Sequence, residues 1–319
     1  MRRVTSLLVR ICISAGILLF LFNRVDKTKI SQAAAGIDKA ILLLVFLLFF
    51  LVYFIGYLRW KTLISGMGLN VPLFIIFRSF CIGIFSNLFF PSTVGGDLVR
   101  GIDLGLRTRK PRSVAASLIL DRISGYFGLV LVCLLAFSAG GGIIADPSVF
   151  FGIGALLLLL CGILAVLFSK LFFSRIGRLL DFFGKPGKTL SKLHTEIYNF
   201  RSQKATILKS ISYSLLIQLV LPLQAYLLCL ALGVRVSPLY FFVFVPIITA
   251  ISALPFSVGG LGLREAGSMY FFAKAGISAE LALTVSLLNF AIIFLLGLCG
   301  GLIYVLTFPY RRLQCDKTG

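Results

Sequence analysis

A ten-residue pattern suited to anion chemistry occurs twice in this chain. PSTVGGDLVR spans residues 91–100 and PFSVGGLGLR spans residues 255–264. Each copy follows an apolar run and places a proline, a hydroxyl, a glycine pair and an arginine at the same spacing. Proline and glycine interrupt helices, and a helix that restarts after a break presents free N–H groups and the positive end of its dipole. The pattern therefore predicts two broken helices whose restarting ends favour phosphate or carboxylate.

The arginine of each copy, Arg100 or Arg264, follows its glycine pair by about one helical turn. There a guanidinium can hold phosphate oxygens through two parallel hydrogen bonds. An arginine at bilayer depth costs about 2.5 kcal/mol or more, so each should have a partner. Within the chain the candidate partners are Asp97 for Arg100 and Glu265 for Arg264. Substrate contact and an internal ion pair both remain open.

Further polar residues in apolar surroundings extend this predicted site. Asp121 and Arg122 are adjacent and do not face each other on a helix, so each needs a partner elsewhere, with Arg100 and Asp97 as candidates. The alternative is a salt bridge or a snorkelling arginine at the membrane surface. Gln218 either lines a cavity or bonds between helices, and for Gln224 an interhelical bond is preferred. The predicted substrate-binding residues are Asn87, Pro91, Gly95, Gly96, Asp97, Arg100, Asp121, Arg122, Gln218, Pro255, Gly259, Gly260, Gly262, Arg264 and Glu265.

The composition indicates a chain embedded in a bilayer. Of 319 residues, 59% are hydrophobic and 13% charged, and the mean hydropathy is +1.04. Soluble domains carry about 25% charged residues. The seven cysteines include no pair with metal-ligand or C-x-x-C spacing, so neither a zinc site nor a disulfide framework is expected. We expect no cofactor and no metal.

The net charge of +20 follows membrane topology rather than nucleic-acid binding. Basic residues concentrate in short segments between apolar spans, at 107–112 and 170–209, and at both ends of the chain. This is the pattern of cytoplasmic loops. We expect a multi-pass protein of the plasma (inner) membrane with both termini in the cytoplasm and no nucleic-acid partner.

Counting spans of about 20 apolar residues predicts crossings at residues 41–58, 114–137, 149–169, 211–232 and 280–307. A shorter candidate at residues 7–22 is expected to be an uncleaved first helix. If the basic loops lie inside, segment 73–100 must enter and leave from the inner side and segment 239–277 from the outer side. The prediction is one all-α polytopic domain, residues 1–319, with about six full crossings and two re-entrant or broken segments in an inverted repeat.

One alternative to this interpretation concerns the glycine pairs. Glycine pairs in membrane helices also serve close packing, although two copies in register make coincidence the weaker explanation.

The segment 170–209 alternates aromatic and basic residues and is predicted to be a cytoplasmic amphipathic segment. His194, within it, is expected to be solvated. No nucleophile, phosphate-loop or metal motif of an enzyme is present in the sequence.

The chain resembles a known family, the lysylphosphatidylglycerol synthase transmembrane region, also called flippase-like membrane proteins. The resemblance rests on NLFFPSTVGGDLVR at residues 87–100, on Asp121-Arg122 and on PFSVGGLGLRE at residues 255–265. It implies an integral inner-membrane protein that moves a lipid or lipid-linked sugar between leaflets, or supports the enzyme that makes it. The soluble domain that transfers lysine in well-known relatives is not expected here, so we do not expect aminoacyl transfer by this polypeptide.

We therefore expect a lipid translocase whose partner is an anionic phospholipid or a polyprenyl-linked lipid. The headgroup would enter between the two broken helices while its tail stays in the bilayer. Transport would be passive, exchange-driven or ion-coupled, with Asp97, Asp121 and Glu265 as proton carriers. The alternative is a membrane enzyme, or an accessory subunit of a glycosyltransferase or lipid-modifying enzyme, in aminoacyl-lipid, hopanoid or glycolipid synthesis. There Asp97 and Asp121 would form a catalytic carboxylate pair.

Overall fold

The computed structural model describes residues 25–90, 95–140, 146–168, 185–253 and 260–307, with residues 16, 17, 19–21 and 23. In this part of the chain the regular structure is entirely helical. Five helices are long and apolar enough to cross a membrane: α3 (Lys39–Gly66), α6 (Pro111–Ala139), α7 (Pro147–Phe168), α10 (Lys204–Ala231) and α13 (Ala279–Leu306). They confirm the five predicted crossings, and the candidate at residues 7–22 lies mostly outside the described residues.

Two of these helices, α3 and α10, extend far beyond their predicted spans. α3 continues to Gly66 and α10 begins at Lys204, each about two turns beyond the apolar count. The apolar count stopped at charged residues, whereas the backbone stays helical through them. The two helices pack antiparallel, because the Asp38 N–H donates to the Ala231 carbonyl at one end and Gly66 lies against Thr206 at the other.

Helix starts follow ordinary capping chemistry. The Asp38 carboxylate accepts from the N–H groups of Ala40 and Ile41 at the start of α3, and the Ser278 hydroxyl caps α13. Asp26 caps the short helix α2 (Lys27–Ala35) in the same way. Pro111 occupies the first position of α6, where its missing N–H costs nothing.

Each predicted broken segment is a pair of short antiparallel helices. The first pair is α4 (Leu73–Ser86) and α5 (Gly95–Thr108), and the second is α11 (Leu239–Ser252) and α12 (Leu263–Ala273). In the first pair Ser79 bonds Asp103 and Gly83 lies against Arg100. In the second Phe244 stacks near Phe271, and Ile248 packs on Gly267. The expected helix breaks are confirmed.

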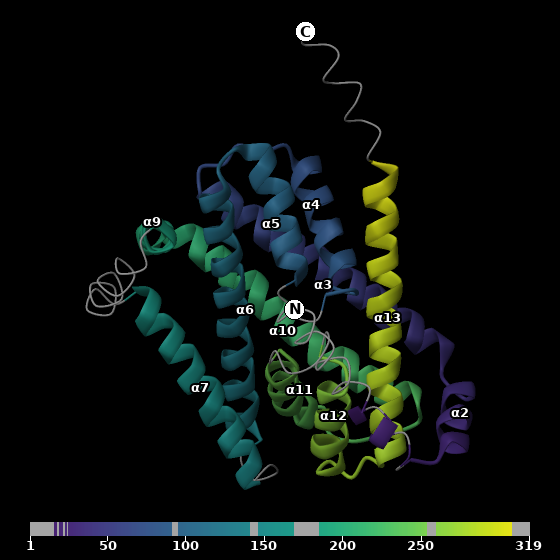
Figure 1. The fold of residues 1–319 in the computed structure, drawn as a ribbon. Helices are drawn as coiled ribbons and strands as arrows, with labels where there is room; N and C mark the ends of the chain where they lie inside the picture. The colour runs from purple at the N-terminus through teal and green to yellow at the C-terminus, as the bar shows by residue number, and fades with distance from the viewer. Residues whose placement is uncertain are drawn as a thin grey trace.

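The two pairs approach from opposite ends of α13. Arg78 of α4 lies over the Tyr304 ring near the end of α13, while the Ile277 N–H donates to Phe272 just before α13 begins. Figure 1 shows α4 and α5 at the end of the molecule where α13 finishes, and α11 and α12 at the end where it starts. This is the arrangement that an inverted repeat requires.

Both helix breaks meet α13 in its middle part. Leu88, just after α4, faces Gly297, and Arg264, at the start of α12, bonds Ser286. These two points are about 16 Å apart along a helix that rises 1.5 Å per residue. The breaks therefore reach the centre of the bundle from the two sides.

The outer surface suits a lipid environment. Large apolar side chains are exposed on α3, α7 and α13, as expected for helices that face acyl chains. Examples are Leu43, Leu47, Phe50, Phe54, Phe151, Leu158, Leu302 and Val305.

An ion pair outside the crossings holds the second helix pair to α7. Lys274, after α12, binds Asp146, which precedes α7. The hydrogen bonds from Lys274 and Ser148 lower the pKa of the Asp146 carboxyl from 3.8 to about 2, and the bond to Asp146 raises the pKa of Lys274. Both groups are therefore charged at neutral pH.

The basic segment folds back onto the bundle. Its described part comprises α9 (Lys185–Asn199) and a short 3₁₀ turn, η1 (Phe200–Ser202), and residues 169–184 lie outside the described residues. The expectation of a solvated His194 is wrong. The side chain is 8% exposed and its Nε2 lies 3.0 Å from the Val166 carbonyl of α7, because α9 packs on α6 and α7.

Candidate functional site

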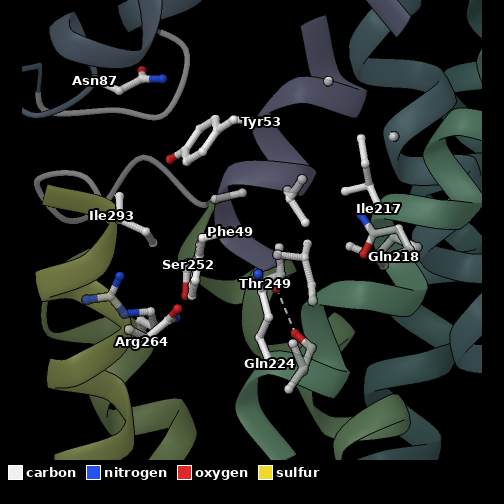
Figure 2. Close-up of a pocket in the computed structure, with 18 of the residues that line it drawn as sticks. Phe49, Tyr53, Asn87, Ile217, Gln218, Gln224, Thr249, Ser252, Arg264 and Ile293 are labelled. Carbon is white, nitrogen blue, oxygen red and sulfur yellow. Dashed lines mark hydrogen bonds between the residues drawn. The ribbon is translucent and has the colours of Figure 1, made fainter. Parts of the chain in front are cut away.

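A cavity of about 540 Å³ lies between the two helix breaks. It is lined by residues of α3, α4, α5, α6, α10, α11, α12 and α13, and both motif arginines, Arg100 and Arg264, reach it. Its volume falls within the usual range of small-molecule sites, roughly 300–1,000 Å³. Figure 2 shows it from one side, with Arg264 on one flank and Gln218 on the other.

Seven of the predicted site residues line this cavity: Asn87, Asp97, Arg100, Asp121, Arg122, Gln218 and Arg264. Five others do not line it and lie at or just before the starts of α5 and α12: Gly95, Gly96, Gly260, Gly262 and Glu265. Pro91, Pro255 and Gly259 lie outside the described residues. Arg100 and Arg264, which are 164 positions apart in the sequence, thus line the same cavity.

The first arginine group is an ion-pair network. Arg100 Nη2 lies 2.8 Å from Asp97 Oδ1 and 2.8 Å from Asp121 Oδ2. Arg122 binds the second oxygen of Asp97, and Arg59 Nε lies 2.6 Å from Asp121 Oδ1. The partners proposed for the adjacent residues Asp121 and Arg122 are therefore those observed. The internal ion pair that was left open for Arg100 is present.

Sequence reasoning missed Arg59 and Trp60. Arg59 directly follows the predicted span 41–58 and is not among the predicted substrate-binding residues. In the folded chain it lies inside α3, binds Asp121 and donates to the Ser214 hydroxyl of α10 at 3.0 Å. Trp60 is fully buried, and the Arg100 guanidinium lies over its ring at 4.5 Å. This cation–π contact stabilises a desolvated arginine.

The second arginine group is smaller. Arg264 binds Glu265, and both contact the Ser286 hydroxyl of α13. Glu265 is completely buried, whereas the Arg264 side chain is 14% exposed and lies over the Phe290 ring at 5.3 Å. Arg264 thus faces the cavity with its counter-ion behind it.

The restarting helix ends already use several of their amides within the chain. The Gly96 N–H donates to the Asn87 side-chain oxygen at 2.9 Å, and the Gly262 N–H donates to Glu265 Oε2 at 2.6 Å. The Arg264 N–H donates to the Gly260 carbonyl. An anion would have to displace these partners to bind the predicted amides. The guanidinium groups are therefore the more accessible donors.

The glycines of the two motifs have different structural roles. A Cβ at Gly96 would overlap the Gly83 carbonyl oxygen and the Asn87 amide, so Gly96 permits α4 and α5 to pack closely. Gly260 and Gly262 adopt φ of 80° and 86°, a region that favours glycine. The close-packing alternative thus describes Gly96, and a turn requirement describes the second motif.

Asp97 and Asp121 have little freedom to act as acids or bases. Both oxygens of each carboxylate contact a guanidinium. A proton or a substrate could reach them only after an ion pair opens. The geometry therefore favours a structural role over the predicted catalytic pair or proton carriage.

An uncharged polar wall lies on α10 and α11. Gln218 and Gln224 of α10 line the cavity, as do Thr249 and Ser252 of α11. Among the described residues, the interhelical hydrogen bond preferred for Gln224 has no partner. Its side-chain nitrogen and oxygen are buried without a hydrogen-bond partner among the described residues.

Comparison with known proteins gives two matches. The family model described as "Lysylphosphatidylglycerol synthase TM region" matches residues 7–301. A protein of Pyrococcus horikoshii named "UPF0104 membrane protein PH1989" is 26% identical over 305 residues, which cover 88% of this chain and 90% of that protein. No solved structure matches.

Proposed function

This chain belongs to the lysylphosphatidylglycerol synthase transmembrane-region family, and from that membership we propose that it moves an anionic phospholipid or a lipid-linked sugar between the leaflets of a bilayer. It is a multi-pass membrane protein by its five long apolar helices and its family. The proposal further places it in the plasma membrane with both termini in the cytoplasm.

The observation that carries the proposal is the charge of the central cavity. Four arginines belong to its described lining: Arg59, Arg100, Arg122 and Arg264. Three carboxylates bind them, so the group keeps one formal positive charge. A phosphodiester carries one negative charge and accepts the hydrogen bonds that guanidinium groups donate. A lipid phosphate would therefore neutralise the site.

The route follows from the two helix pairs. Each pair ends at the cavity and packs on α13 from its own side. If the α4–α5 pair and the α11–α12 pair move in turn, the cavity opens toward one face and then the other. The phosphate would compete with Asp97 for Arg100 and Arg122 while the tail remains in lipid.

The alternative function is an accessory subunit of a lipid-modifying enzyme. It requires no chemistry from Asp97 or Asp121, whose oxygens are bound by arginines. The two functions differ in what the purified protein does alone. A translocase moves lipid in pure vesicles, whereas an accessory subunit requires its enzyme.

The test is leaflet exchange in proteoliposomes that contain phosphatidylglycerol with a fluorescent acyl chain. A membrane-impermeant reductant should quench the inner-leaflet lipid only in vesicles that hold active protein. Arg100→Gln and Arg264→Gln should abolish this exchange, and lysine at either position should restore part of it because the charge is kept.

The matched control is Arg235→Gln, which removes an exposed arginine outside the cavity and should exchange lipid at the wild-type rate. If the fluorescence of vesicles with wild-type protein falls no further than that of empty vesicles, the result would contradict translocation and favour the accessory role.

A further inference from the structure

We propose that Gln224 and the uncharged polar side chains near it bind a hydroxyl-bearing part of the headgroup. The lipid carried would then be a phosphodiester extended by a polyol or a sugar rather than by an amine. This inference rests on the proposed function and names the class of its substrate.

The first observation concerns the buried side-chain amide of Gln224. It lines the cavity from α10, is 1% exposed, and has neither amide atom bonded to any described residue. Buried amides are almost always hydrogen-bonded, and an unpaired one is unfavourable. An amide both donates and accepts, which matches a hydroxyl group. A ligand hydroxyl would satisfy this side chain.

The neighbouring hydroxyls add acceptors without charge. Thr249 donates to the Val245 carbonyl and Ser252 to the Ile248 carbonyl, each within α11. Their oxygens keep lone pairs for a ligand donor. Figure 2 shows Thr249 and Gln224 between Arg264 and Gln218.

This uncharged wall connects the two arginine groups. On α10 it begins after Ser214, which accepts from Arg59, and Gln224 lies about 15 Å further along the helix. On α11 it ends at Ser252, which lies against Gly260 shortly before Arg264. A phosphate held by either arginine group would therefore place its extension along this wall.

An amine in the headgroup would find no carboxylate partner here. Asp97, Asp121 and Glu265 are all bound by arginines, and the cavity's described lining contains no other acidic residue. The segments at 91–94 and 254–259, PSTV and LPFSVG, contain none in their sequence. An ammonium would instead meet guanidinium groups of like charge. The site thus selects against aminoacyl and ethanolamine headgroups.

The experiment measures lipid binding to the purified full chain in detergent by native mass spectrometry. The probes are short-chain phosphatidylglycerol, phosphatidic acid and phosphatidylethanolamine. Wild-type protein should bind phosphatidylglycerol about tenfold more tightly than either of the others, because one set of buried hydrogen bonds is gained. Gln224→Leu should remove that preference and leave phosphatidic acid binding unchanged.

The control Gln32→Leu replaces an exposed glutamine of α2 and should change nothing. Equal binding of phosphatidylglycerol and phosphatidic acid by wild-type protein would overturn the subsite, and so would tighter binding of phosphatidylethanolamine. Both results are measured on the wild-type protein alone, and both leave the translocase proposal standing. Failure to bind any of the three lipids would overturn the translocase proposal and this inference with it.

Discussion

At the scale of single residues, the site is defined by how many partners each buried charge has. Arg100 is shared by Asp97 and Asp121, and each of these carboxylates also binds another arginine. Glu265 has one arginine, Arg264, and in addition accepts from the Gly262 N–H at the start of α12. Losing one member of the first group therefore leaves fewer groups unpaired than losing Glu265.

We expect Glu265→Gln to lower the free energy of unfolding by about 3 kcal/mol or more, because it removes one partner of a buried pair. Arg100→Gln should cost clearly less, about 1–2 kcal/mol, since Arg59 and Arg122 still hold the two aspartates. Thermal unfolding in one detergent measures both. A larger loss for Arg100→Gln than for Glu265→Gln would contradict the shared-partner description.

At the scale of elements, the first helix pair depends on close backbone approach. Gly83 of α4 faces both the carbonyl of Gly96 and the side chain of Arg100. On α13, Gly297, Gly300 and Gly301 similarly admit Leu88, Cys81 and Phe85. Small residues thus form both faces between which α4 is held. These contacts hold α4 against α5 and α13.

Gly96→Ala should destabilise the protein by roughly 1–3 kcal/mol and reduce lipid exchange, because the new methyl group overlaps the Gly83 carbonyl. Gly154→Ala is the matched control in α7, where nothing lies near the added atom. It should be neutral or slightly stabilising, since alanine favours a helix over glycine. Equal thermal stability of the two variants would show that the α4–α5 contact is not tight.

At the scale of the whole molecule, the inverted arrangement predicts on which side of the membrane each loop lies. The turn between α5 and α6 lies at the end where α13 finishes, and the loop between α10 and α11 lies at the opposite end. The basic loops predict that the first of these ends is cytoplasmic. Residues at the same end of the molecule should therefore all be accessible from the same side of the membrane.

In a variant without native cysteines, new cysteines at Ser138 and Ser237 should react with an impermeant maleimide added to intact cells. Cysteines at Thr108 and Ser202 should react only after the membrane is opened. Labelling of Thr108→Cys from outside would overturn the inverted repeat as proposed, because the α4–α5 pair could then not enter from the cytoplasmic side.

The sequence by itself determined the helical class, the five described crossings and the two breaks. Apolar length sets a crossing, and proline with glycine sets a break, and both are local properties. Charge counting also assigned the two breaks to opposite sides, which agrees with their approach to α13. The pairing of Arg100 with Asp97, which is observed, was one of the two alternatives that the sequence left open.

Only the tertiary structure decided which distant residues complete the site. Arg59 and Ser214 join Asp121 because α3 and α10 pack beside α6, and no local signal in the sequence marks that contact. The sequence likewise did not show that the Gln224 amide has no partner among the described residues, because a glutamine that bonds between helices and one that lines a cavity have the same sequence pattern. Helix formation depends on neighbours along the chain, whereas ion pairing and cavity lining depend on the packing of helices that are far apart in sequence.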